Sequence, residues 1–203
     1  MKFETGEIGV DQLKLIPLHD KLYINGEWRP SHGDEWMVAI NPATEEEVGR
    51  VPAAVEQDID DAVAAAREAF DKGPWPRMSL KERADIILKA MEYLRAMSDD
   101  MAYTITQEMG CTIAQSLSVQ VPRAVDVWEY YAKHAQNYAW TERRETYDAL
   151  NADFEILVQK DPVGVVAAIV PWNGPQIVTA LKLGRKFLGI EIETEYCLLA
   201  AKR

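Results

Sequence analysis

The residues with the clearest capacity for chemistry form a turn, Pro171-Trp172-Asn173-Gly174-Pro175, directly after an apolar run. That run, VGVVAAIV at 163–170, has the composition of a strand buried on both faces of a parallel sheet. Ligands of open α/β sheets bind beyond the carboxyl ends of the strands, and a helix start offers free N–H groups to an anion such as a pyrophosphate. The side-chain amide of Asn173 can also donate a hydrogen bond to a developing oxyanion. The structural alternative is that Asn173 only caps the helix and Trp172 only fills the core.

The cysteines and histidines indicate no metal site and no disulfide framework. Cys111 and Cys197 are the two cysteines, and the three histidines are scattered without a shared ligand spacing. Cys111 follows QEMG at a predicted helix end, which favours a structural role, and Cys197 lies in a predicted terminal strand. We therefore expect a metal-free protein.

Length and charge narrow the class further. The 203 residues suffice for one domain or a domain and a half, and 48% of them are hydrophobic. A net charge of −11 argues against a nucleic-acid binder and against docking on anionic membranes. No apolar run approaches the ~20 residues that span a bilayer, and the first residues lack the apolar core of a secretory signal. The expectation is a cytoplasmic protein.

The first part of the chain predicts strands and then a helix. LYINGEW at 22–28 alternates around Asn25-Gly26, which is typical of a β-hairpin, and a short strand at 37–40 follows. A helix over 57–72 is then predicted by apolar residues at helical spacing, which are Ile59, Ala62, Val63, Ala66 and Phe70. Its start is weakly capped, because Val55 stands where serine or threonine is favoured.

Three more helices are expected before the chain returns to strands. Ser79 and Glu82 form a capping box for the first. Its predicted apolar face consists of Leu80, Ala84, Ile87, Leu88, Met91 and Leu94. The second begins near Ser98 and stops at Gly110. The third, about 112–140, must bend or break at Pro122. Beyond this helix we expect three strands: a half-exposed strand at 154–160, the buried strand at 163–170 and an acidic-faced strand at 190–198. One further helix is expected to start at Pro175.

Six blocks in order resemble the NAD(P)-dependent aldehyde dehydrogenase family over about 21–183: LYINGEW, INPATEEEVGRVP, DIDDAVAAAREAF, WPRMSLKERADIILKAMEYL, QEMGCTIAQS and VGVVAAIVPWNGP. The resemblance implies an α/β fold, namely a partial doubly wound (Rossmann-like) cofactor domain with N-terminal helices and an extra β oligomerisation segment. It assigns 1–137 and 161–183 to the incomplete cofactor domain, and 138–160 and 184–203 to oligomerisation-type strands. It further implies that the catalytic domain is absent from this chain.

The resemblance also implies a chemistry. In the family a cysteine thiolate attacks the aldehyde, a hydride passes to NAD or NADP, and a glutamate-activated water releases the acid. Asn173 matches the oxyanion-hole amide. Lys182 matches a helix lysine to which no chemistry is assigned. The residues that match the strand end in contact with the cofactor are Ile169, Val170, Pro171 and Trp172.

The family blocks that carry the nucleophile, the general base and the ribose-binding lysine do not follow Leu183. The tail GRKFLGIEIETEYCLLAAKR instead resembles the family's extreme C-terminus, which favours an internal deletion, with a frameshifted tail as the alternative. We expect a chain that binds dinucleotide weakly and is inactive alone. Two other hypotheses remain open: a non-catalytic partner of intact family subunits through edge strands, and a degenerate remnant. The particular aldehyde, and the choice between NAD and NADP, stay unassigned.

Overall fold

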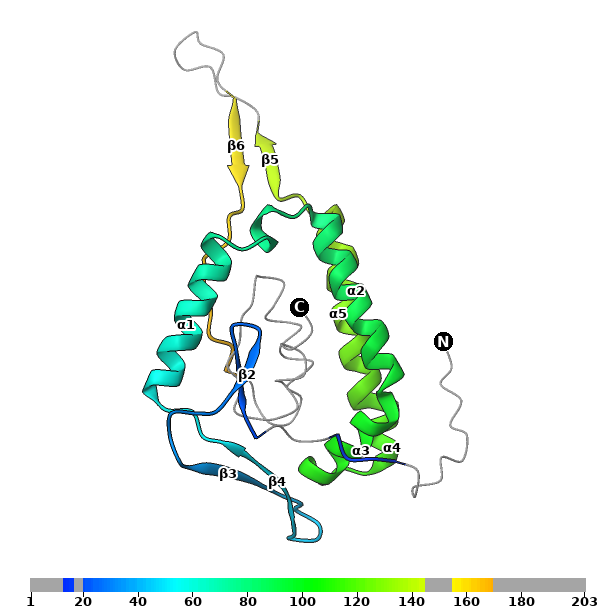
Figure 1. Cartoon of the computed structure of the whole chain (residues 1–203). Coiled ribbons are helices and arrows are strands. Elements are labelled where there is room, and N and C mark those ends of the chain that lie inside the picture. The colour runs from blue at the N-terminus through cyan, green and yellow to red at the C-terminus, as the bar shows by residue number, and fades with distance from the viewer. Residues whose placement is uncertain (1–12, 17–19, 145–154, 170–203) are drawn as a thin grey trace.

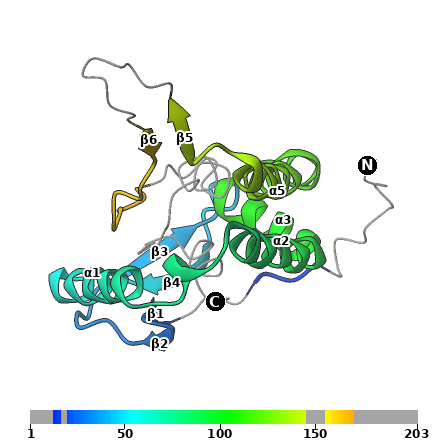
Figure 2. The same cartoon turned by 90° about the horizontal axis from the view of Figure 1, so that it is seen from above.

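The computed structural model describes residues 13–16, 20–144 and 155–169 of the chain. Helix α1 lies apart from the group formed by α2, α3 and α5, and a β-hairpin projects beyond the helices (Figure 1). The view from above shows the same separation (Figure 2). The strands of the described part form three separate two-stranded antiparallel sheets. A parallel sheet is therefore not found within these ranges.

The first hairpin confirms the Asn-Gly prediction. Strands β1 (Leu22–Ile24) and β2 (Glu27–Arg29) pair antiparallel, with Ile24 opposite Glu27. Asn25 and Gly26 both have positive φ, 54° and 84°, as a tight turn between right-twisted strands requires. The buried side chains of Leu22 and Ile24 pack on α1.

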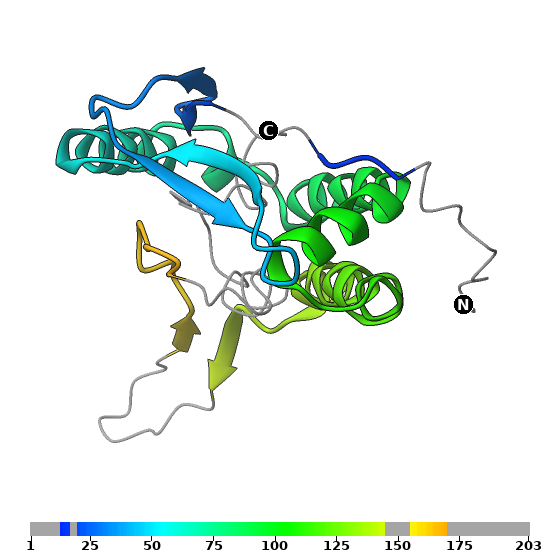
Figure 3. The same cartoon turned by 90° about the horizontal axis from the view of Figure 1, so that it is seen from below.

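The second hairpin reaches from α1 to the helical group (Figure 3). It consists of β3 (Trp36–Ile40) and β4 (Glu47–Pro52), and its turn begins at the buried Asn41. The Asn41 side chain accepts a hydrogen bond from the Ala43 N–H (2.8 Å) and donates one to the Gln107 side chain (2.8 Å). The Asn41 amide therefore shapes the turn and also joins it to Gln107 of α3 (Ser98–Met109).

Helix α1 (Glu56–Asp71) confirms the predicted range to within a residue at each end, but its buried face differs from the prediction. The small Ala62 is buried against the first hairpin with Ala65 packed beside it, and Ala66 is also buried, whereas Ile59 and Val63 are 39% and 50% exposed. The strands approach the helix closely along its alanines, so the larger apolar side chains are left at the edge of the contact.

The C-terminus of α1 is closed by an arginine from the next turn. In the short helix η2 (Trp75–Arg77), the Arg77 guanidinium donates to the carbonyls of Lys72 and Gly73, both at 2.6 Å. The last carbonyls of a helix lack partners within it, so these bonds satisfy groups that otherwise face water.

Helix α2 (Leu80–Ala96) begins at the predicted capping box. The Glu82 N–H donates to the Ser79 hydroxyl (3.2 Å), and the Ser79 N–H donates to the Glu82 carboxylate (2.7 Å). Its predicted apolar face is confirmed. All six predicted residues are buried or half-buried: Leu80, Ala84, Ile87, Leu88, Met91 and Leu94.

Helix α3 (Ser98–Met109) ends at Gly110, which is left-handed at φ 73° as predicted. The next helix does not break. Short α4 (Ile113–Gln115) continues through the π-helical segment η3 (Ser116–Gln120) into α5 (Val121–Asn137). Pro122 sits in the first turn of α5, and the wider turns before it accommodate its missing N–H and its ring.

The end of the described chain differs from the prediction at one strand. Strand β6 (Ile156–Gln159) is confirmed and pairs with β5 (Thr141–Arg144). Residues 161–169 form no strand, and Val163 is 71% exposed. A buried strand needs neighbours on both sides, and the described residues provide none for this segment.

Candidate functional site

The predicted oxyanion and cofactor residues fall largely beyond the described residues. Val170, Pro171, Trp172 and Asn173 lie outside them, as do Lys182 and Cys197. Ile169 is described and is 85% exposed. The structure therefore shows the approach to the predicted site, which is the segment 161–169.

This segment runs beside α1, where Gly164 provides close contact. Gly164 is buried with φ 115°, and a Cβ placed there would lie 3.3 Å from Nη1 of Arg67. The Arg67 guanidinium lies over the Phe70 ring (4.5 Å to the centroid) and is paired with Asp71 four residues on. A side chain at position 164 would thus be strained and would press on an arginine already held in place.

Cys111 occupies a packed environment. Its Sγ lies 3.0 Å from Oγ of Ser116, a fully buried hydroxyl that also bonds Thr106 at 2.8 Å. The thiol packs against the apolar cluster of Met101, Ala102 and Val121. A thiol packed among apolar side chains beside a buried hydroxyl suits a structural cysteine.

A buried carboxylate near the first hairpin is the polar centre that the sequence interpretation missed. Asp58 has a fully buried side chain on α1 and accepts hydrogen bonds from Ser31 Oγ (2.6 Å) and the Val55 N–H (3.0 Å). His32 adds its Nδ1 at 2.7 Å and its backbone N–H at 3.2 Å. Asp58 thus satisfies the backbone N–H of the N-cap residue Val55, and it joins the β2–β3 connection to the helix.

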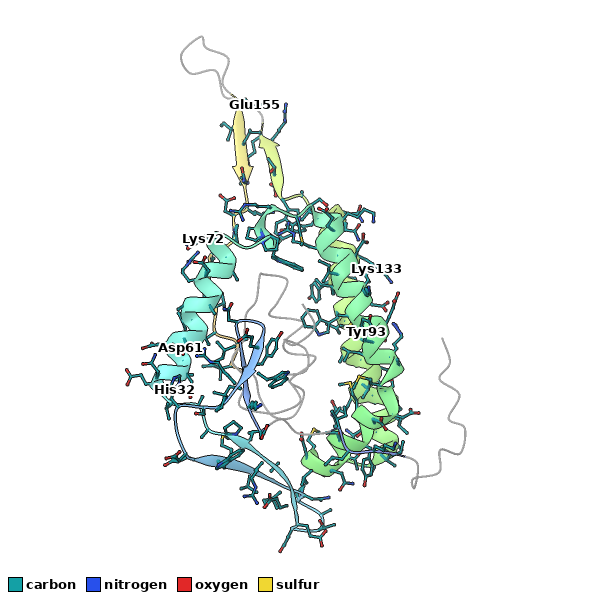
Figure 4. The ribbon with its side chains drawn as sticks, viewed as in Figure 1. His32, Asp61, Lys72, Tyr93, Lys133 and Glu155 are labelled. Carbon is teal, nitrogen blue, oxygen red and sulfur yellow. The ribbon has the colours of Figure 1, made fainter. Side chains whose placement is uncertain are left out.

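These contacts set the charge state of Asp58. Burial raises the pKa of the carboxyl, but hydrogen bonds from Ser31, Val55 and His32 outweigh it and lower the pKa from 3.8 to about 2. The neighbouring Asp61, labelled with His32 in Figure 4, is ion-paired with Arg29. An acidic residue three positions after a non-polar N-cap is the sequence signal for such a carboxylate cap.

Another group of charges among the described residues connects two helices. Glu129 on α5 is paired with Arg95 of α2 and with Lys133 of its own helix. No cluster of three or more histidine, cysteine or acidic side chains suited to a metal occurs among the residues that the structure places. Among the described helices, none combines the length and apolar character that a bilayer crossing requires.

Comparison with known proteins identifies the class. The model of the aldehyde dehydrogenase family matches residues 28–188. Aldehyde dehydrogenase 1 of Tanacetum cinerariifolium is 35% identical over 163 residues, which are 80% of this chain and 32% of that protein. The NADP/NAD-dependent aldehyde dehydrogenase PuuC of Escherichia coli (strain K12) is 30% identical over 174 residues, 86% of this chain and 34% of its own.

Solved structures agree in fold. The aldehyde dehydrogenase of Mycobacterium tuberculosis complexed with NAD+ superposes with a TM-score of 0.80 at 34% identity, over 91% of this chain and 38% of that one. A P. syringae indole-3-acetaldehyde dehydrogenase with NAD+ and IAA gives 0.80 at 26% identity, over 91% and 39%. The fold is thus a partial α/β Rossmann-like domain of the kind that these enzymes contain.

The chain belongs to the aldehyde dehydrogenase family. It spans about a third of the length of the curated relatives above, 32% and 34%. Membership confirms the resemblance carried by the six sequence blocks.

Proposed function

We propose that this chain provides part of the cofactor domain of an aldehyde dehydrogenase that oxidises an aldehyde to a carboxylic acid with NAD(P)+. The observation that carries the proposal is the family match across residues 28–188, which includes the PWNGP turn. Two relatives with NAD+ in their structures support the cofactor class. Within this chain, 1–137 and 161–183 are assigned to the cofactor domain and 138–160 and 184–203 to oligomerisation strands.

The proposed cofactor contacts are Ile169, Val170, Pro171 and Trp172. The exposed apolar side chain of Ile169 fits contact with a flat cofactor ring, because such rings bind against apolar surface. The bound dinucleotide supplies the hydride acceptor. Asn173 is proposed to donate its amide N–H to the oxygen of the reacting carbonyl, and an amide does so without a change of protonation.

We expect no aldehyde oxidation by the purified 203-residue polypeptide alone. Neither Cys111 nor Cys197 has the family's surrounding motif, and an oxyanion donor without nucleophile and base cannot form an acyl-enzyme. NADH formation followed at 340 nm with acetaldehyde and longer aldehydes measures this, with an intact relative as the positive control. Turnover that Cys111→Ala or Cys197→Ala abolishes would contradict the expectation. Calorimetry with NAD+ gives a separate readout, for which we expect weak binding.

A non-catalytic role is the second candidate, and exposed apolar residues on the β5–β6 hairpin favour it. Ile156 and Leu157 of β6 are 46% and 53% exposed, and β6 pairs only with β5 among the described strands. A strand with an open edge and apolar side chains can add to the sheet of another subunit. An intact family subunit is the proposed partner.

For this role we expect a soluble complex when the tagged chain is co-expressed with an intact relative. The variant Leu157→Asp should reduce recovery of the complex about tenfold or more, because a charge replaces apolar contact. Lys133→Asp on α5 is the control at a site away from the hairpin. Insoluble or protease-sensitive chain with no complex would instead favour a degenerate remnant.

A further inference from the structure

The junction between α5 and the β5–β6 hairpin is built from a column of aromatic rings. Tyr130 and His134 stack at 5.6 Å with their planes 6° apart, because residues four apart lie on one helix face. His134 contacts Tyr138 at 5.8 Å, and Tyr138 meets Trp140 edge-on at 4.9 Å. The column therefore continues past the end of α5 at Asn137 and into the start of the hairpin.

Lys160, which directly follows β6, closes this column. Nζ of Lys160 lies 2.9 Å from the Tyr138 hydroxyl, 2.8 Å from the Glu142 carboxylate and 3.3 Å from the Ala139 carbonyl. The same ammonium lies 4.5 Å from the centroid of the Tyr138 ring. An ammonium has three N–H donors, so these three oxygens can use all of them.

Backbone bonds hold the two chain segments together at the same place. The Lys160 N–H donates to the Trp140 carbonyl (2.9 Å), directly beyond the last strand pair, Thr141 with Gln159. The Trp140 indole N–H donates to the Ala135 carbonyl of α5 (2.9 Å). Both segments of the hairpin are thereby tied to the helix.

A single exposed ion pair contributes little, about 1 kcal/mol or less. The Lys160 arrangement differs because one ammonium joins the helix end, the connection and the first strand. The hydrogen bonds to Glu142 and then to Tyr138 raise the pKa of Lys160, so the group keeps its charge over the physiological range. The hairpin itself projects away from the helices, and no further strand among the described residues pairs with it (Figure 1).

We propose that Tyr138, Trp140 and Lys160 form a latch that fixes the direction in which the β5–β6 hairpin leaves α5. The ammonium of Lys160 joins Tyr138 to Glu142 of β5, and the backbone N–H of Lys160 joins the Trp140 carbonyl. The latch holds the exposed Ile156 and Leu157 in one orientation. That this orientation serves association with another subunit rests on the proposed function. Lys160 is a positioning residue, and no chemistry is assigned to it.

Distances between spin labels test the latch in the full chain. Nitroxide labels are attached to Asp126→Cys on α5 and Arg144→Cys on β5. The native cysteines are removed by Cys111→Ala and Cys197→Ala. The distance between the labels, measured by pulsed electron paramagnetic resonance, reports the direction of the hairpin. Lys160→Met should broaden the distance distribution about twofold, because the hairpin then samples several directions. Lys133→Met, which removes an exposed lysine from the ion pair with Glu129, should leave it unchanged.

Two further variants keep the test decisive. Lys160→Arg keeps the charge and the donors and should restore a narrow distribution, whereas Tyr138→Phe removes only the hydroxyl and should broaden it partly. An unchanged distance distribution in Lys160→Met would overturn the latch. It would also be overturned if Tyr138→Phe kept a narrow distribution while its circular dichroism showed a loss of helix. The measurement needs no partner, so a narrow wild-type distribution with no complex formed counts only against the proposed association.

Discussion

Replacing Asp58 with alanine is expected to lower the free energy of unfolding by about 3 kcal/mol. The change leaves the Ser31 hydroxyl, two backbone N–H groups and the His32 ring without their shared acceptor. It also removes the carboxylate that accepts the N–H of Val55 at the start of α1, where the Val55 side chain cannot accept a hydrogen bond. Urea unfolding followed by circular dichroism measures the loss.

Asp60 provides a matched control. It lies two residues further along the same helix and is exposed, so Asp60→Ala should change the free energy of unfolding by less than about 0.5 kcal/mol. Equal effects of the two substitutions would show that burial and the four donors at Asp58 add nothing to stability.

The same carboxylate makes part of the stability depend on pH. Because folding lowers the pKa of Asp58 from 3.8 to about 2, its contribution is complete above pH 3.8 and is lost as the pH falls towards 2. The shift corresponds to about 2 kcal/mol. Other carboxyl groups with lowered pKa values, such as Glu82 and Glu129, also lose stability as the pH falls, so the measured quantity is a difference between chains. Between pH 4 and 2 the wild-type and Asp60→Ala chains should lose about 2 kcal/mol more than the Asp58→Ala chain.

Gly110→Ala is the second change with a large expected effect, a loss of about 3 kcal/mol in the free energy of unfolding. Gly110 ends α3 at φ 73°, which an L-residue adopts at a cost of about 1 kcal/mol. An added Cβ would also meet Cγ of Pro42 at 2.4 Å, closer than packing permits. The substitution would push the turn of the β3–β4 hairpin away from the helix.

Gly26→Ala separates the two causes. Gly26 has a similar φ of 84°, but nothing lies within 4 Å of an added Cβ, so only the backbone cost of about 1 kcal/mol remains. Pro42→Ala combined with Gly110→Ala should recover the difference between the two glycine substitutions. Equal losses at both glycines would mean that the contact with Pro42 does not matter.

Helices could be predicted from the sequence because their signals are local. The capping box of Ser79 and Glu82 and the left-handed Gly110 fix ends within a few residues, and periodic apolar residues identify the length between them. The Asn25-Gly26 hairpin is equally local. Each of these features needs only neighbours in the chain.

Features that depend on distant partners were predicted less well. The run 163–169 has strand composition but no partner strand within the described residues, and β5 is formed by the charged TERR, whose pairing comes from β6. Asp58 binds Ser31 and His32, more than twenty residues away, so its burial is invisible to local pattern. The predicted site residues Val170–Asn173 stay a prediction, since they lie beyond the described ranges.

The π-helical segment Ser116–Gln120 changes the angular phase of the helix that contains it. A π turn takes in one residue more than an α turn, which rotates the side chains that follow by about 100° relative to an uninterrupted helix. Ser116 can therefore face Cys111 and Thr106 while Val121 joins the cluster of Met101 and Ile105. The extra residue of the π-helical segment thus lets α4 and α5 both present their apolar sides to the core. Deleting one residue within the segment would turn α4 away from the core and leave the packing of α5 on α2 unchanged.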